Sequence, residues 1–131
     1  MIMMKDGQLE KRIRKELRSI ADVLESPGIF SDEDAYWVNA KEIAHFHDGS
    51  LELRLTRALI RAHRERLRAD RRIERRAPSS DWIVVRCGSS RDVALVRELA
   101  ELAAAAHRPP PGALPELPPT GAALERRRRF H

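Results

Sequence analysis

The chain has 131 residues, of which 34% are charged and 5% are aromatic, with a formal net charge of +5. This length predicts one domain with a modest core, and no apolar run is long enough for a membrane span or a signal-peptide core. Much of the basic excess lies from Arg108 onward, where five arginines face two glutamates. The charge is therefore weak evidence for nucleic-acid binding. The single Cys87 cannot form a disulfide within the chain, and a cytoplasmic location is expected.

Apolar residues spaced by three and four predict an amphipathic helix over residues 8–25. Its stripe consists of Leu9, Ile13, Leu17, Ile20 and Leu24. The segment 26–28, Ser-Pro-Gly, is expected to end this helix because proline and glycine break helices. Ile29 and Phe30 then predict a short edge segment or a hydrophobic staple before the acidic loop 31–34.

A three-stranded meander is predicted from Tyr36 to Leu55. Asp48-Gly49 lies between two alternating runs and favours a two-residue hairpin turn, because both residues tolerate positive φ. The predicted pairs are Phe46–Leu51, Ala44–Leu53 and Glu42–Leu55 on an apolar face, and His47–Ser50, His45–Glu52 and Ile43–Arg54 on the other. A four-residue loop keeps these faces, whereas a three-residue loop mixes them, which the pattern disfavours.

The turn before this hairpin is expected at residues 39–41. It places Trp37 on the face of Ala44 and Phe46. Tyr36 is then predicted on the face of the two histidines, which makes it a candidate site residue.

Thr56 is the predicted N-cap of a helix that runs to about Ala69. His63 lies at the border of its apolar stripe, where a packed histidine is more usual than a ligand. Residues 71–76 predict a charged edge strand. Residues 82–87 form the most β-prone run and predict a central strand that is covered on both faces near its start.

Cys87 is interpreted as a small buried hydrophobe, because no catalytic signature surrounds it. Residues 89–92 predict a capped start for an Ala-rich helix that reaches His107. After Arg108 the prolines predict a tail without helix or strand, whose four final arginines, 126–129, could contact an acidic surface.

These elements predict an α+β fold in the order helix, three strands, helix, two strands, helix. The sheet is expected to be antiparallel with about five strands and to carry its helices mainly on one face. The predicted organisation is a flexible N-terminus over 1–7, one domain over 8–107 and a Pro/Arg-rich, disordered tail over 108–131.

The histidine face is the candidate site. Directly opposed residues have Cβ atoms about 4.5–5.5 Å apart, so His45 and Glu52 can form a hydrogen bond. A carboxylate beside an imidazole is the arrangement that general acid/base catalysis requires. The candidate catalytic residues are His45, His47, Glu52 and Tyr36, and the candidate substrate-binding residues are Ser50, Arg54 and Trp82. Two alternatives remain open: a plain solvent-exposed polar face, or a metal site in which Glu52 or Asp48 supplies a third ligand.

The run Glu42–Leu55 resembles the His-x-His…Asp-Gly-Ser-Leu-x-Leu-x-Leu signature of the luciferase-domain family, which includes fungal luciferases and many small bacterial proteins of undefined role. Residues 37–39, the helix from Thr56, the 80–82 strand and the final helix also resemble its short members, so the resemblance covers roughly residues 10–107. Fungal members oxidise a hydroxylated pyrone with dioxygen. The resemblance therefore implies an α+β domain without a metal or organic cofactor, and it makes the two histidines candidate bases or oxyanion partners. This chain is expected to differ from the fungal enzymes, which have an extended, membrane-anchored form, and light emission is not expected.

Three functions are compatible with these observations. The first is dioxygen-dependent oxidation of a small enolic or phenolic compound, in which His45, positioned by Glu52, removes a proton and His47 and Tyr36 stabilise the enolate. The second is a non-catalytic module that binds protein or nucleic acid through its arginines, although no aromatic platform accompanies them. Those arginines are Arg57, Arg61, Arg64, Arg68, Arg71, Arg72, Arg75 and Arg76. The third is metal-dependent hydrolysis. A small molecule is the expected partner, and no membrane contact is expected.

Overall fold

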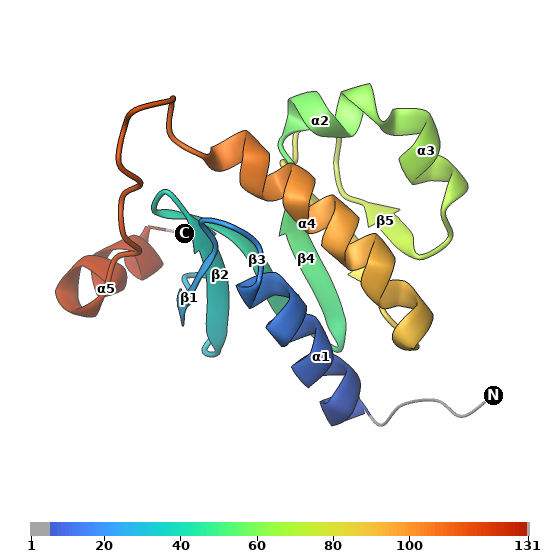
Figure 1. The fold of residues 1–131 in the computed structure, drawn as a ribbon, viewed down its shortest axis with the longest axis horizontal. Helices are drawn as coiled ribbons and strands as arrows, with labels where there is room; N and C mark the ends of the chain where they lie inside the picture. The colour runs from blue at the N-terminus through green and yellow to red at the C-terminus, as the bar shows by residue number, and fades with distance from the viewer. Residues whose placement is uncertain (1–5, 131) are drawn as a thin grey trace.

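The computed structural model describes residues 6–130, and its strands form one antiparallel sheet in the order β1-β2-β3-β4-β6-β5 (Figure 1). The strands are β1 (Leu24–Pro27), β2 (Asp34–Val38), β3 (Lys41–His47), β4 (Ser50–Arg54), β5 (Ile73–Arg75) and β6 (Trp82–Arg86). The helices are α1 (Asp6–Arg18), α2 (Arg57–Ala62), α3 (Arg64–Ala69), α4 (Val93–His107) and α5 (Gly121–Arg129), with a 3-10 turn η1 (Ser90–Asp92). The predicted α+β class is confirmed, and the order of elements broadly matches. None of the helices within the described residues is long and apolar enough to cross a membrane.

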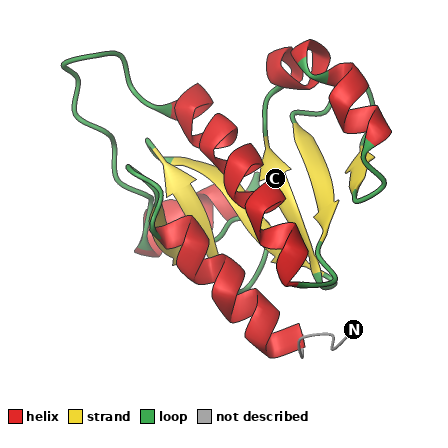
Figure 2. Cartoon of the chain, turned by 45° about the vertical axis from the view of Figure 1, so that its right-hand side comes forward, coloured by secondary structure: helices red, strands yellow, loops and turns green. Residues whose placement is uncertain are grey.

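The hydrophobic core lies between the sheet and two long helices, α1 and α4, which run side by side across one face (Figure 2). Ile13 and Leu17 from α1 and Leu99 from α4 are almost completely buried there. They pack in one cluster with Leu51 and Leu53 of β4. The face of β3 and β4 that points away from these helices carries the histidines, so the core and the candidate site occupy opposite sides of the same strands.

The first helix ends earlier than predicted. The α1 helix stops at Arg18, Asp22 has a positive φ of 71°, and Leu24 begins β1 by pairing with Trp37 of β2. Leu24 is 42% exposed, although the helical pattern predicted it in the core. The prediction of helix through residue 25 is wrong because the edge of β2 offers backbone hydrogen bonds to this segment, which a periodic pattern does not reveal.

The predicted helix from Thr56 is divided into α2 and α3. The Thr56 hydroxyl accepts a hydrogen bond from the Leu59 N–H at 3.3 Å, which confirms the N-cap. His63 leaves the helical conformation with φ −105° and ψ 19°, although its N–H still donates to the Leu59 carbonyl. This break turns α3 so that Leu67 is fully buried.

The second half of the sheet follows the prediction. Strand β5 is an edge strand, and β6 lies between β4 and β5. The capping box before α4 is present, because the Ser89 side chain and the Asp92 carboxylate each bond the other's backbone N–H. Cys87 is half-buried against the core, and burial raises the pKa of its thiol to about 11.

The tail contains a helix, so the prediction that no helix follows Arg108 is wrong for α5. Leu124 of this helix is 5% exposed. Arg127 donates to the Ala40 carbonyl at 2.8 Å, and Arg128 donates to the Gly28 carbonyl at 3.1 Å. These contacts place α5 beside the β2–β3 turn. The predicted domain boundaries at residues 7 and 107 remain predictions, and residues 1–5 of the predicted flexible N-terminus lie outside the described residues.

Candidate functional site

The pairing of β3 with β4 in a hairpin determines which residues lie on the histidine face. Its turn residues Asp48 and Gly49 have φ values of 48° and 78°, as a type I′ turn requires. The observed pairs are Ala44–Leu53, His45–Glu52, Phe46–Leu51 and His47–Ser50. The register predicted from the two turn residues is confirmed over these four pairs, and it places His45 and Glu52 side by side.

A β-bulge in β3 changes the face of the residues before Ala44. Trp37 pairs with Glu42 and Tyr36 pairs with Ala44, so Ile43 is an extra residue on β3. Ile43 and Ala44 are both fully buried in the core, and Glu42 turns to the histidine face. The predictions that Glu42 lies on the apolar face and Ile43 on the histidine face are therefore wrong.

The same bulge removes Tyr36 from the site. Tyr36 lies on the helix side of the sheet, where its hydroxyl donates to Glu25 Oε2 at 2.5 Å and accepts from Arg14 Nη1 at 3.2 Å. Burial, with the Glu25 hydrogen bond, raises its pKa well above the usual value. Trp37 takes the opposite face, and its indole N–H donates to the Ser26 carbonyl at 3.2 Å. The predicted faces of Tyr36 and Trp37 are thus exchanged.

His45 is held between two carboxylates. The residue is 3% exposed, with Nε2 2.6 Å from Glu52 Oε1 and Nδ1 2.8 Å from Glu42 Oε2. Within residues 6–130, Nδ1 and Glu42 Oε2 have no well-directed hydrogen bond, so this second contact is an ion pair. Burial lowers the pKa of His45, but its attraction to Glu42 and Glu52 outweighs burial and holds this pKa above 6.5. The two carboxylates thus stabilise the imidazolium form relative to the neutral ring.

The outer carboxylates are also anchored. Glu42 is 1% exposed, and its Oε1 accepts the backbone N–H of Ile29 at 2.5 Å. Glu52 is 8% exposed, and its Oε2 accepts from Arg76. The site therefore contains a chain of ion pairs from Glu42 through His45 and Glu52 to Arg76, which follows β5.

A hollow of about 340 Å³ opens beside His45. Its lining residues are Phe30, His45, His47, Glu52, Arg76 and Trp82. Three rings form its wall: the centroid of His45 lies 4.9 Å from that of Trp82 and 5.7 Å from that of Phe30. Four residues predicted from the sequence, His45, His47, Glu52 and Trp82, therefore line one hollow.

The remaining candidates lie at or beyond the rim. The His47 side chain is 61% exposed, and its Nε2 lies 3.2 Å from the Asp48 carboxylate. Ser50 is half-buried opposite His47 and does not line the hollow. Arg54 stacks over Trp82, with Cζ 4.8 Å from the ring centroid, and lines a second hollow.

Sequence reasoning missed three residues of the site: Glu42, Phe30 and Arg76. The sequence did contain a signal for Glu42, because it lies inside a strand. A buried carboxylate is too costly without a partner, so a glutamate at such a position indicates a polar partner nearby. Phe30 lies after Pro27-Gly28 in a segment with no periodicity, and the sequence places Arg76 among the arginines of an edge strand that could serve an interaction module. Their roles depend on contacts between separate elements.

No metal site emerges from the described residues. No three His, Cys, Asp or Glu side chains within residues 6–130 form a group that could hold a metal ion. Glu52 and Asp48, the predicted third ligands, contact different histidines. The arrangement is that of charge pairs at a hollow.

These features define a small α+β domain with a histidine–carboxylate cluster on the sheet face opposite its helices. Residues 40–103, about half of the chain, match the family model described as Luciferase domain. This match assigns residues 40–103 of the chain to the luciferase-domain family. The matched stretch contains the cluster and Trp82, whereas Phe30 and α5 lie outside it. Neither the curated proteins nor the solved structures gave a significant match.

Proposed function

We propose that the hollow beside His45 binds a small, planar, weakly acidic molecule, an enol or a phenol, and accepts its proton. One observation carries this proposal: a buried imidazole between two carboxylates lines a hollow that the rings of Trp82 and Phe30 also line. Aromatic walls favour flat ligands. A group that gains or loses a proton is costly to bury without a role, and such groups concentrate at functional sites.

The base in this proposal is Glu52. Both ring nitrogens of His45 lie within 2.8 Å of a carboxylate oxygen, so neither has a lone pair directed at a ligand. A carboxylate oxygen accepts more than one hydrogen bond, so Glu52 can receive a substrate proton while His45 and Arg76 orient it. His47 lies at the exposed rim, where it can exchange that proton with water.

The specific version of the proposal is oxidation by dioxygen. The deprotonated substrate donates the electron pair of its carbanion to dioxygen, a carbon–oxygen bond forms, and dioxygen is reduced to the level of a peroxide. The proton held at Glu52 then passes to the peroxide oxygen. The cationic Arg76 at the hollow stabilises the negative charge while it moves.

Proton transfer is tested with para-nitrophenol, whose phenolate is yellow. The full chain is titrated with this phenol, and the phenolate absorbance is compared among the wild type, Glu52→Gln and the control Glu74→Gln. Glu74 is an exposed carboxylate that pairs with Arg86 outside the hollow. Wild type and the control should shift the bound phenol toward phenolate, and Glu52→Gln should not. Absence of binding, or an equal shift in a folded Glu52→Gln protein, would contradict the proposal.

Oxidation is tested separately with triacetic acid lactone, an enolic pyrone, by following dioxygen with an oxygen electrode. Uptake that Glu52→Gln lowers at least about tenfold, and that Glu74→Gln leaves unchanged, would support the oxidase. No uptake despite binding would end the oxidative version and leave a binding site.

The alternative proposal, an interaction module using the arginines within residues 57–76, has less support. Arg72 is bound by Asp70 and Asp92, and Arg76 by Glu52, so these two are engaged within the fold. Nucleic-acid binding would weaken steeply as salt rises. A titration of the full chain with a short RNA at two salt concentrations tests it, and absent or salt-independent binding would remove it.

A further inference from the structure

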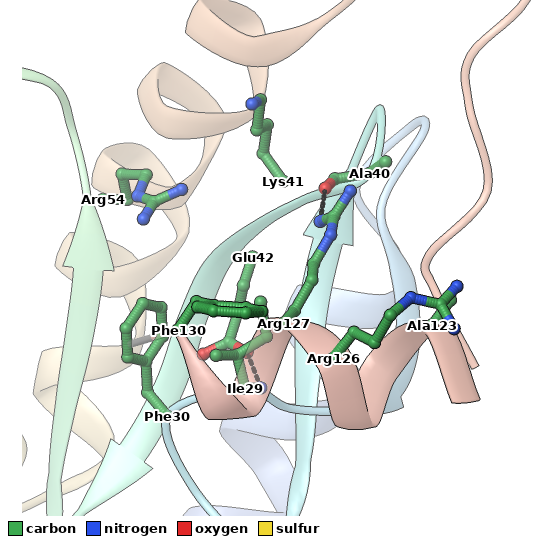
Figure 3. A pocket seen from close by; sticks show the side chains of 10 residues that line it. All are labelled: Ile29, Phe30, Ala40, Lys41, Glu42, Arg54, Ala123, Arg126, Arg127 and Phe130. Atoms are coloured by element: carbon green, nitrogen blue, oxygen red, sulfur yellow. Dashed lines mark hydrogen bonds between the residues drawn. The ribbon is translucent and has the colours of Figure 1, made fainter. Parts of the chain in front are cut away.

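A second and larger hollow, of about 630 Å³, lies between α5 and the histidine face of the sheet (Figure 3). Glu42 and Arg54 line it from the sheet, and Phe30 lines it from the loop before β2. The other side is formed by α5 and by Phe130, which follows that helix. The segment outside the Luciferase-domain match therefore completes this hollow.

The charges that line this hollow do not balance. Four of its lining residues are cationic, namely Lys41, Arg54, Arg126 and Arg127, and one is anionic, Glu42. Glu42 is already engaged by the Ile29 N–H and by His45. The cations come from the sheet and from α5, so their proximity depends on the docking of the tail and is unfavourable without a compensating anion.

Two of these arginines occupy defined positions. Arg54 Nε is buried and has no hydrogen-bond partner among the described residues, and burial lowers the pKa of its guanidinium. A buried donor without a partner is costly, and a ligand oxygen would satisfy it. Arg127 donates one N–H to the Ala40 carbonyl, as the dashed line in Figure 3 shows, which fixes its guanidinium beside the hollow.

The apolar part of the lining indicates what the ligand carries besides charge. Phe130 is 84% exposed although it lines the hollow, and Phe30, which also lines it, is 39% exposed. A ligand with an apolar body would cover both rings. Inorganic anions alone would leave this surface in contact with water.

We propose that this hollow is a binding site for a small organic acid, whose oxyanion is held by Arg54 and Arg127 and whose apolar body packs against Phe30 and Phe130. Arginine holds carboxylate and phosphate oxygens through paired N–H donors, so both head groups share the required chemistry. This site shares Phe30 with the hollow at Glu52, but Arg54 and Arg127 line only the larger hollow, and binding there requires no proton transfer. It gives α5 a function in ligand binding.

The proposal is tested with the full chain by ligand-observed NMR titration. Benzoate and phenyl phosphate are the two oxyanion probes, and benzyl alcohol is the neutral probe of similar shape. The variants are Arg127→Gln from α5 and Arg54→Gln from β4. Arg129→Gln is the matched control, because it removes the same charge from an exposed position of α5 that does not line the hollow. Circular dichroism monitors the fold of each variant.

At least one oxyanion should bind, and comparison of benzoate with phenyl phosphate identifies the head group. Arg127→Gln and Arg54→Gln should each weaken binding by about fivefold to tenfold, and Arg129→Gln by less than about twofold. If Arg127→Gln releases α5, Arg54→Gln still tests the site from the sheet. Failure of both anions to bind, equal binding of benzyl alcohol, or an equal loss in Arg129→Gln would overturn the proposal.

This result is separable from the proposed function at the first hollow. Glu52→Gln removes the proposed base and should retain binding of the oxyanion probe. Loss of the para-nitrophenol signal with retained benzoate binding would leave the anion site standing alone, and the opposite pattern would leave only the acid/base site.

Discussion

Replacing Glu42 by glutamine removes one of the two carboxylates that form ion pairs with the protonated His45 ring. Glutamine keeps the shape and keeps an oxygen that can accept the Ile29 N–H. It loses the ion pair of 2.8 Å with His45, a residue that is 3% exposed. Breaking a buried ion pair costs about 3–5 kcal/mol, but here Glu52 still pairs with the histidine. We expect Glu42→Gln to lower the free energy of unfolding by about 2–3 kcal/mol at about pH 6.

The loss should depend on pH in a defined direction. The folded-state pKa of His45 is raised, so its contribution to stability is complete below the unfolded pKa of about 6.5 and disappears as pH rises through the folded pKa. Glu42→Gln removes one of the carboxylates that raise the pKa of His45, so the folded-state pKa lies closer to the unfolded value. The difference between variant and wild type should therefore be largest at about pH 6 and smaller at about pH 9.

Urea unfolding followed by tryptophan fluorescence at both pH values measures this difference. The control is Glu98→Gln, which removes an exposed carboxylate paired with Arg66 and should cost less than about 0.5 kcal/mol. An equal loss at both pH values would show that packing, rather than the His45 proton, carries the effect. No loss at either pH would refute the buried ion pair itself.

Three further predictions follow from the fold. Tyr36→Phe should cost about 1 kcal/mol in a thermal melt, because the hydroxyl bond to Glu25 is lost, and should leave para-nitrophenol binding unchanged; weaker binding would return Tyr36 to the site. Ala40→Gly should raise the free energy of unfolding by up to about 1 kcal/mol, because this turn residue has a φ of 61°, which glycine adopts without strain. The melting temperature should rise accordingly; a lower melting temperature would contradict the turn geometry. Gly28→Ala should cost about 1–3 kcal/mol, because an added Cβ would lie 3.0 Å from Glu42 Oε1; an unchanged urea midpoint would show that the loop relaxes freely.

The sequence alone determined the features that depend on neighbours along the chain. The turn at Asp48-Gly49 requires two positive φ values and therefore fixed the pairing of His45 with Glu52. Thr56 and the box that begins at Ser89 marked helix starts, because these caps are made within one turn of the backbone. In each case the deciding atoms are only a few residues apart.

Tertiary structure decided what the site contains. The bulge at Ile43 exchanges the faces of Tyr36 and Trp37 and brings Glu42 to His45. No turn residue in the sequence predicts this bulge. It is stabilised by partners from other segments, since Glu42 can be buried only where the Ile29 N–H and the His45 ring both receive its carboxylate. The same reason applies to β1 and α5, whose local patterns predicted a helix and an irregular tail. Each adopts its structure because a distant part of the chain offers backbone groups that would otherwise lack a hydrogen bond.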